Sequence, residues 1–395
     1  SSLAAALDFR PAWSVATRWE TLPGLGGRIR FFPQGATTRA KAALTRNAPL
    51  FRPAPAVDLT LGYAAGNVPG TALIISLLGS LANHAARGGT PAPAMVVRNS
   101  RHEPLFTPWV LSAIEAVDPD LVAGLAVMIW DYDDPALQAL LFRSAGLMLA
   151  AADDSTIAAL DAWRARYAPD LRFHRHGHKV SFVTLGSHWA AQPDAPHQAA
   201  LDSSFWDQNG CLSARVHFVE ADAPEYARAL ADEMRSLVQA LPRGTTPRRF
   251  THRAFDSYAS LTGSGRVRLL SEYDDDFAVI LDDRPWDAGA LRRAANSCQG
   301  RVVVVRPVDD VMEIPRLLRA LPAANLQSMS VLLDQGRLEP FAQAVGARGV
   351  TALRSLGRAA FPQLAYSWDG LLPTDVCHLR SPGHFATIEL SIGNI

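Results

Sequence analysis

The apolar residues of this chain fall into short runs that alternate with longer segments of helical period. Four runs have the length and composition of buried strands: VDLTLGY (57–63), AMVVR (94–98), GLAVMIWD (124–131) and GLMLAAA (146–152). Four segments with a helical spacing of apolar positions follow them, over 71–86, 105–117, 134–145 and 155–167. Strands without polar alternation, joined by helices of ten or more residues, predict a parallel sheet that is covered on both faces.

A second series of the same kind begins after residue 180. Its strand-like runs are 215–220, 277–283, 301–308 and 328–334, with helical patterns after the last two. Segment 223–241 is strongly amphipathic, 242–249 has the composition of a loop, and 384–390 alternates like a strand. We therefore predict an α/β protein in three parts. They are an N-terminal region with a Rossmann-type dinucleotide-binding domain over 1–180, a catalytic α/β domain over 181–375, and a strand over 376–395 that returns to the first domain or to a partner subunit.

Charge and cysteine content narrow the function classes. Lys plus Arg and Asp plus Glu both number 38, so no global field favours nucleic acid or a membrane surface as partner. The three cysteines are widely spaced, which argues against a disulfide framework and fits a reducing cytoplasm. The most apolar run, 71–86, is too short and too interrupted to span a bilayer. We expect a soluble cytoplasmic enzyme or binding protein.

Cys211 is the first candidate for chemistry, in the segment WDQNGCLSARVHFVE (206–220). It follows Gly210 in a connection between a helix-like segment and a strand, where functional residues are often placed. A thiolate there would be a nucleophile. A lone cysteine is also often a small buried apolar residue, so the segment alone leaves both interpretations open. Cys298 and Cys377 have no second supporting feature.

Two consecutive strand ends carry polar residues. The loop GYAAGNVPG (62–70) places Gly66 and Asn67 where ligands of open α/β sheets bind. The Asn67 amide can donate to a developing oxyanion, or the residue can serve the turn alone. The next strand ends in RNSR (98–101), and arginines at that place suit the 2′-phosphate of NADP, although they are also common as solvated surface residues.

Two further segments are less specific. ADDSTIAAL (152–160) begins a helix with good capping residues, but the chain lacks the glycine-rich dinucleotide and phosphate-loop fingerprints. In HRHGHK (174–179), three alternating histidines would share one face of a strand. No acidic residue or cysteine accompanies them at ligand spacing, so we predict no metal site there. A general acid, a phosphate contact or a polar strand end are the other interpretations.

In their order along the chain, five motifs resemble a known family: AGNVPG, APAMVVRNS, ADDSTIAAL, GHKVSF and DQNGCLSARVHFVE. They look like those of the acyl-CoA reductases of the bioluminescence (Lux) fatty-acid reductase type, which are similar to the aldehyde dehydrogenase superfamily. The resemblance runs from about residue 57 to 225 and, more weakly, includes SPGHFATIEL at the end. The QNGCLS run is its strongest piece and looks like the family's nucleophile signature.

The resemblance implies an aldehyde dehydrogenase-like fold with the active site between a cofactor domain and a catalytic domain. It places the nucleophile on Cys211 and the oxyanion donor on Asn67. Arg98 stands where aldehyde dehydrogenases usually carry lysine, and Arg101 stands near the place of a glutamate in NAD-preferring relatives, so both favour NADPH. The remaining cofactor contacts that it implies are Gly66, Ser100, Ser155 and Thr156.

The resemblance also implies a reaction. Hydrolytic relatives carry a glutamate base ahead of the nucleophile, where this chain has RHGHKVSF (175–182) without a carboxylate. An acyl-enzyme on Cys211 would then survive to accept hydride, so that an acyl-CoA or acyl-carrier protein is reduced to a fatty aldehyde. His176 or His178 would protonate the leaving thiolate. An acyl-activating ligase or synthetase partner and a homo-oligomer are expected. The alternatives are an oxidative NAD(P)-dependent aldehyde dehydrogenase and an idle scaffold of the same fold.

Overall fold

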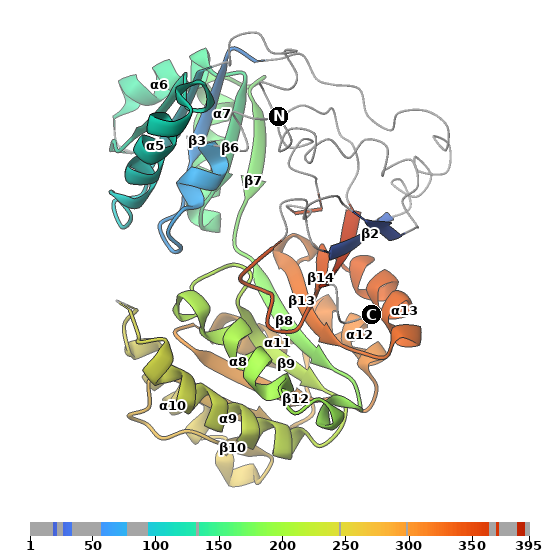
Figure 1. Ribbon diagram of the computed structural model, residues 1–395. Coiled ribbons are helices and arrows are strands. Elements are labelled where there is room, and N and C mark those ends of the chain that lie inside the picture. The colour runs from blue at the N-terminus through green and yellow to red at the C-terminus, as the bar shows by residue number, and fades with distance from the viewer. Residues whose placement is uncertain are drawn as a thin grey trace. The chain divides into compact units, whose positions relative to one another are not determined.

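The computed structural model describes residues 57–76, 94–131, 134–244, 246–297, 299–362 and 369–370, and the backbone of three further strands. The described residues from 57 to 178 form one compact unit, and those from 179 onward form another together with the three further strands (Figure 1). We call them the first unit and the second unit and describe each by itself. The functional domains over 1–180, 181–375 and 376–395 stay a prediction.

The first unit is built on a parallel five-stranded sheet with the order β5-β4-β3-β6-β7. Its strands are β3 (Leu59–Tyr63), β4 (Ala94–Arg98), β5 (Leu125–Met128), β6 (Leu147–Ala151) and β7 (Arg172–His176). Its helices are α5 (Phe106–Val117), α6 (Pro135–Ser144) and α7 (Asp154–Tyr167), and residues 71–76 are helical as well. The chain runs outward from β3 and then returns to β6 on its other side. Such a reversal of strand order marks the usual ligand position at the carboxyl edge of an open sheet.

Local sequence explains where these helices begin. The Asp134 side chain accepts hydrogen bonds from two backbone N–H groups of the first turn of α6, at 3.0 and 2.9 Å, and a proline occupies the first helical position. Asp153 caps α7 in the same manner. The packed face of the sheet then buries Tyr63, Phe142 and Met148 in one apolar cluster.

The second unit contains a ten-stranded sheet with the order β1-β2-β15-β14-β13-β8-β9-β12-β11-β10, parallel from β15 to β11. Its strands are β1 (Trp19–Thr21), β2 (Gly27–Pro33), β8 (Val180–Leu185), β9 (Ala214–Val219), β10 (Val267–Leu269), β11 (Ala278–Asp282), β12 (Val302–Pro307), β13 (Leu326–Leu332), β14 (Ala352–Ser355) and β15 (Phe385–Ser391). Its α-helices are α8 (Ala195–Ser204), α9 (Ala223–Ala240), α10 (Arg249–Ala259), α11 (Ala288–Ser297), α12 (Ile314–Leu317) and α13 (Gln335–Gly346).

Alternate residues of these strands enter two separate cores. Phe182, Phe218 and Val304 pack with α10 to α13, whereas their neighbours Val183, Val219 and Val305 pack with α8 and α9. The period of two in a strand requires this division. The near-continuous apolar runs in the sequence reflect burial on both faces.

Most predicted elements are confirmed, and three features differ. The loop expected over 242–249 leads into α10, and neither α10 nor α11 was predicted. Strand β7 ends at His176, so the idea that His174, His176 and His178 share one strand is wrong. The C-terminal strand β15 lies in the larger sheet, parallel to β14 and antiparallel to β2. Of the predicted helix over 71–86, residues 77–86 lie outside the described part.

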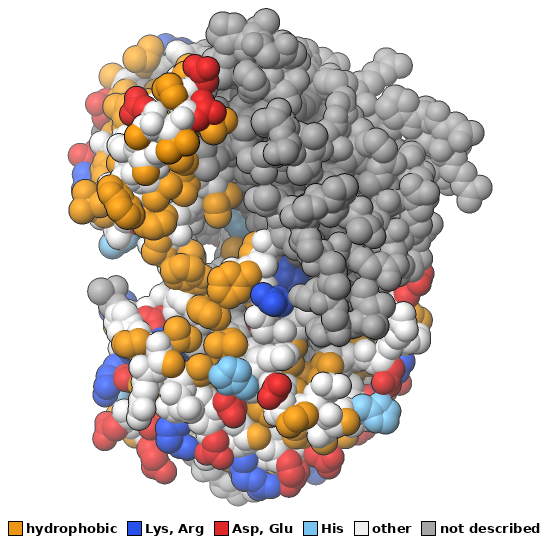
Figure 2. Space-filling model, in the orientation of Figure 1, with side chains coloured by type: hydrophobic (Ala, Val, Ile, Leu, Met, Phe, Trp, Pro, Cys, Tyr) orange, Lys and Arg blue, Asp and Glu red, His pale blue; other side chains and the backbone are white. Residues whose placement is uncertain are grey.

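Helix α5 presents apolar side chains to solvent. Leu105, at its start, is 76% exposed and Trp109 is 72% exposed, and apolar side chains gather on this face of the first unit in Figure 2. Side chains of this size on a helix surface are a feature of places where another surface packs. Within the described ranges, no helix has the length and apolar character needed to cross a membrane.

Candidate active site

Cys211 lies in a tight turn at the amino end of strand β9. The turn connects α8, through a short 3-10 segment (Phe205–Gln208), to the start of β9 at Ala214. The thiol is half-buried and forms no disulfide. The Ser181 hydroxyl on β8 donates to the Cys211 carbonyl oxygen at 2.8 Å, which ties the turn to the neighbouring strand.

The backbone just before the cysteine is strained. Trp206, Asp207 and Gln208 have φ of 56°, 49° and 61°, in the left-handed region that favours glycine. Each such residue costs about 1–3 kcal/mol and persists only where the surroundings determine it. Strained residues cluster at functional sites, so three consecutive ones make this turn a candidate for such a site.

The Gln208 side chain opposes this strain by joining two strands. Its Nε2 donates to the carbonyl oxygens of Ala214 at 2.7 Å and Val302 at 2.6 Å, and its Oε1 accepts from the Val302 N–H at 2.8 Å. The side chain is fully buried. It therefore satisfies backbone groups at the start of β9 and β12 that the ladder leaves open.

Asp207 forms a buried ion pair with Arg301. Arg301 Nε and Nη2 lie 2.9 and 2.8 Å from Asp207 Oδ1, and both side chains are more than nine-tenths buried. Asp207 Oδ2 also accepts the Gly244 N–H at 2.8 Å. Arg301 itself has a φ of 67° after Gly300 with a φ of 68°, so a second strained turn meets the first.

The sequence analysis assigned no role to Asp207, Gln208 or Arg301. The available signal for Asp207 and Gln208 was that they directly precede the Asn-Gly-Cys motif. Arg301 had no such signal, because it is far from Cys211 in the chain and only the pairing of β9 with β12 brings it close.

In the first unit, the loops after β3 and β4 pack closely at the carboxyl edge of the sheet. A Cβ atom at Gly66 would lie 2.1 Å from the Ser100 Oγ, so only glycine fits there. Asn67 follows with an exposed position. Ser100 is buried, and its hydroxyl accepts the His102 N–H at 3.2 Å. The structure therefore brings Gly66 and Ser100 together, with Asn67 beside them.

The two candidate arginines of this edge have different environments. Arg98 is 8% exposed and its Nε donates to the Trp130 carbonyl oxygen at 3.0 Å. Arg101 is 62% exposed and pairs with Asp131, which is equally exposed. An exposed pair of this kind is weak and exchanges partners readily, so Arg101 is available to an anionic ligand.

The start of helix α7 is occupied by its own carboxylates. Asp153 accepts the Thr156 N–H at 2.7 Å and the Ser155 hydroxyl at 2.6 Å, and these hydrogen bonds lower the pKa of Asp153. Asp154 accepts the His178 N–H at 2.7 Å, across the turn at Gly177. The positions predicted for phosphate contacts, Ser155 and Thr156, are thus engaged by an acid.

The histidines next to this helix start are placed on or after β7. His176 is the buried last residue of β7, and His178 is half-buried two residues later. Among the residues that the structure describes, no group of three or more His, Cys, Asp or Glu side chains is arranged to hold a metal ion. His176, His178 and Asn67 belong to the first unit, and Cys211 belongs to the second.

A buried polar cluster lies under helix α8, which leads into the cysteine turn. His217 Nε2 is 2.8 Å from the Ser203 hydroxyl and its Nδ1 is 2.8 Å from the Tyr226 hydroxyl. Burial lowers the pKa of His217 to about 3, so its ring is neutral near pH 7. Burial also raises the pKa of Asp202 to about 6, although it accepts the Gly357 and Ala359 N–H groups.

Comparison with solved structures identifies the class of fold. The chain is similar to a Δ1-pyrroline-5-carboxylate dehydrogenase from Mycobacterium tuberculosis, with a TM-score of 0.57, 14% identity and coverage of 97% of this chain and 70% of that chain. It is also similar to aldehyde dehydrogenase 21 from Physcomitrella patens in complex with succinate, with a TM-score of 0.58, 11% identity and coverage of 99% of this chain and 78% of that chain. A third similar structure is a putative methylmalonate-semialdehyde dehydrogenase from Sinorhizobium meliloti 1021 complexed with NAD, with a TM-score of 0.56, 13% identity and coverage of 99% of this chain and 76% of that chain. The fold is that of the aldehyde dehydrogenases.

The family follows from the sequence itself. The family model described as acyl-CoA reductase (LuxC) matches residues 51–376. The chain therefore belongs to the acyl-CoA reductase (LuxC) family and is an oxidoreductase, which confirms the resemblance drawn from its motifs. No curated protein sequence matches it.

Proposed function

We propose that this protein reduces an acyl thioester, carried by CoA or by an acyl carrier protein, to the aldehyde with NADPH, through an S-acyl intermediate on Cys211. Membership of the acyl-CoA reductase family supports the overall reaction. The observation that carries the assignment of the nucleophile is the strained turn before Cys211, whose three left-handed residues are held by buried side chains. Strained residues of this kind cluster at active sites, which supports a role in chemistry for this cysteine.

The reaction begins with attack of the Cys211 thiolate on the thioester carbonyl carbon. The Asn67 side-chain amide and the Cys211 backbone N–H stabilise the oxyanion that forms. The bond from carbon to the CoA sulfur then breaks, and His176 or His178 protonates the departing thiolate, which leaves the acyl group on Cys211.

The reduced nicotinamide supplies a hydride to the acyl carbon when it is bound. The resulting hemithioacetal on Cys211 collapses, so that the aldehyde leaves and the cysteine thiolate is restored. The hemithioacetal oxyanion keeps the same two donors during this step. Oxidation of NADPH thus balances reduction of the acyl carbon by two electrons.

The residues of the first unit fit a dinucleotide in part. The order of strands in the parallel sheet reverses beside β3, which is the usual ligand position of an open sheet. Gly66 has no side chain beside Ser100, so a cofactor can approach the backbone of this loop closely. Exposed Arg101 would hold the 2′-phosphate of NADPH. The start of α7 fits less well, because Asp153 already binds Ser155 and Thr156. We therefore propose a site centred on the β3 and β4 loops, with Arg98 beneath it.

Slow hydrolysis of the acyl-enzyme is part of the proposal. The segment from Arg175 to Phe182 contains no carboxylate, but Asp154 reaches it from α7. Asp154 accepts the His178 N–H, and a Cβ atom at Gly177 would lie 2.4 Å from its Oδ1. One oxygen of this carboxylate therefore fixes the turn, and whether Asp154 also activates water separates the reductive reaction from the oxidative aldehyde dehydrogenase alternative.

The wider setting stays a prediction. We propose a cytoplasmic enzyme that receives its thioester from an acyl-activating ligase or synthetase and that forms a homo-oligomer. The alternative is an idle scaffold of the same fold, which would bind a carrier protein or a synthetase partner but not NADPH. Calorimetric titration with NADPH separates an enzyme from such a scaffold.

The decisive experiment follows NADPH consumption with a panel of acyl-CoA esters that differ in chain length and aromaticity, together with intact-mass measurement. We expect the wild type to gain one acyl group at Cys211 from acyl-CoA alone and to lose it as aldehyde when NADPH is added. Cys211→Ala should show neither the mass increase nor turnover. Reductase activity in Cys211→Ala would overturn the proposal.

A further inference from the structure

The turn that carries Cys211 is held from one side by side chains that the proposed reaction does not use. We propose that Asp207, Gln208 and Arg301 are positioning residues, which hold the Cys211 thiol in the one orientation that attacks a thioester. This inference rests on the proposed function of Cys211. It assigns a catalytic consequence to a buried ion pair and a buried amide that do not touch the substrate.

The contacts fix the last two residues of the strained segment, Asp207 and Gln208. Asp207 is joined to Arg301 by two short contacts and to the Gly244 N–H by a third. Gln208 is joined to the first residues of β9 and β12. A left-handed backbone over three non-glycine residues relaxes when such contacts are lost, so the turn would then populate other conformations.

The segment after these residues is also tied to the second unit. Asn209 Nδ2 donates to the Thr246 hydroxyl at 2.6 Å, and the Cys211 carbonyl oxygen accepts from Ser181. The Ser213 N–H donates to the Gly210 carbonyl oxygen at 3.1 Å, which closes the turn. Polar groups before and after the Cys211 side chain are thus hydrogen-bonded to neighbouring segments, and its half-buried thiol forms no disulfide.

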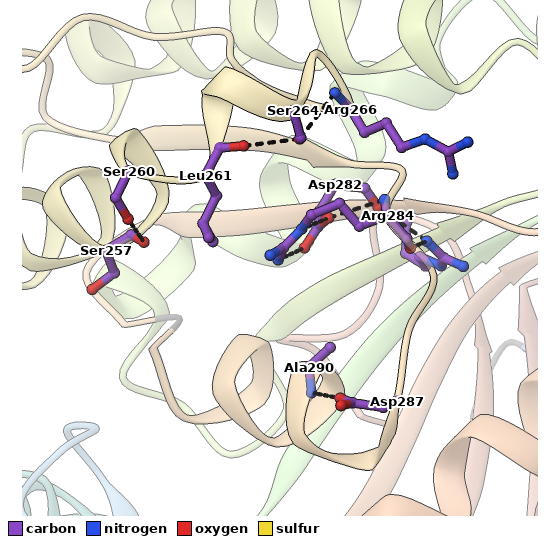
Figure 3. Close-up of polar contacts among 10 residues, drawn as sticks. Ser257, Ser260, Leu261, Ser264, Arg266, Asp282, Arg284, Asp287 and Ala290 are labelled. Carbon is purple, nitrogen blue, oxygen red and sulfur yellow. Dashed lines mark hydrogen bonds and ion pairs between the residues drawn. The ribbon is translucent and has the colours of Figure 1, made fainter.

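A buried ion pair can also be replaced by apolar residues without loss of stability, and this separates positioning from folding. In Asp207→Leu/Arg301→Met both charges are removed together, so no unpaired charge is buried. The pair Asp282–Arg284 offers a matched control (Figure 3), since Arg284 Nε and Nη2 lie 2.8 and 2.7 Å from the buried Asp282 carboxylate. It lies at the carboxyl end of β11, whereas the Cys211 turn lies at the amino end of β9.

The test measures single-turnover S-acylation of Cys211 by acyl-CoA, alkylation of the same thiol by iodoacetamide, and the thermal midpoint. We expect Asp207→Leu/Arg301→Met to acylate fully but about 10- to 100-fold more slowly, the usual effect of a displaced reacting group, with KM within about twofold of the wild type. Alkylation should change far less, because a small reagent needs no fixed orientation. Asp282→Leu/Arg284→Met should acylate at the wild-type rate.

A second variant, Arg301→Lys, keeps the inference testable if the first variant does not fold. Arg301→Lys keeps the buried charge but loses the paired contact from Nε and Nη2, and we expect an intermediate acylation rate at full amplitude. Wild-type acylation rates in both variants would overturn the inference and leave the proposed function intact, as would equal loss of acylation and alkylation. Absence of any acyl group on wild-type Cys211 would overturn the proposed function and this inference with it.

Discussion

At the scale of a single residue, Asn67 has one role in the proposed chemistry, which is to donate a hydrogen bond to the oxyanion. It follows the central strand β3, at the point where the sheet reverses its order, and it is exposed. An exposed residue in a loop contributes little to folding stability. A thermal midpoint measured beside kcat therefore separates an effect of its replacement on the reaction from an effect on the fold.

We expect Asn67→Ala to lower kcat by about 10²–10³-fold, the usual effect of removing one oxyanion donor. The thermal midpoint should stay that of the wild type. Asn67→Asp is the matched control, because it keeps the shape, lacks the amide donor and places a negative charge beside the oxyanion, so it should be at least as slow. An unchanged kcat in both variants would remove Asn67 from the mechanism.

At the scale of elements, the cluster under α8 joins three of them. His217 on β9 bonds to Ser203 on α8 and to Tyr226 on α9, and its folded-state pKa of about 3 lies below its ordinary value of 6.5. Between these values the unfolded chain binds a proton that the folded protein excludes. The free energy of unfolding therefore falls as pH drops below 6.5. Asp202, with its raised pKa, opposes part of this fall between about 6 and 3.8.

The His217→Gln variant isolates this effect, because glutamine keeps hydrogen-bonding groups but does not titrate. Between pH 7.5 and 5.5 the wild type should lose about 1.4 kcal/mol more of its free energy of unfolding than the variant, since one pH unit below the unfolded pKa corresponds to that amount. Denaturant titrations at the two pH values measure the difference. Parallel pH dependence in the two proteins would show that His217 titrates normally in the folded state.

At the scale of the whole molecule, the question is which acceptor takes the acyl group from Cys211. The proposal requires that water is a poor acceptor of the acyl group, although the Asp154 carboxylate reaches the turn at His178. The reverse reaction should then depend on free CoA. With aldehyde and NADP+, we expect CoA to raise NADPH formation by about 10²-fold or more, the usual contribution of a positioned general base that hydrolysis would otherwise need.

The matched variant for this prediction is Asp154→Asn, which leaves an acceptor for the His178 N–H. It should form acid from aldehyde as slowly as the wild type. Rapid acid formation by the wild type without CoA, abolished in Asp154→Asn, would identify an oxidative aldehyde dehydrogenase with Asp154 as its base.

The sequence pattern predicted most strands of the first sheet and several of the second, but it missed β8 (Val180–Leu185), which is buried throughout. Runs such as Ala94–Arg98 and Val302–Pro307 begin with four consecutive apolar residues, and the structure places them in the sheets. Helices α10 and α11 escaped prediction, although their buried positions recur at helical spacing once their bounds are known. Strand β14 escaped because four residues contain too little pattern to separate from a loop.

Some features of the candidate site were predicted from the sequence, and others were found only in the structure. Cys211, Asn67 and the family were accessible from motifs, because each motif is a contiguous stretch whose chemistry depends on neighbouring residues. The sequence predicted that Asp153 is a capping residue. It did not predict that the Asp153 carboxylate accepts the hydrogen bond of the Ser155 hydroxyl. The burial of Arg98 against Trp130 was not visible, because the partner lies on another strand's loop.

By itself, the sequence determined much of the alternation of strands and helices, the candidate for the nucleophile and the family, because these depend on local periodicity and short contiguous patterns. Only the tertiary structure decided that Arg301 supports the cysteine turn, that Asp154 holds the turn at His178, and that β15 joins β14 and β2. Each of these depends on groups that are distant in the chain and meet only when strands pair. A hydrogen bond or an ion pair leaves no periodic trace in the sequence, so it becomes visible only once the sheets have formed.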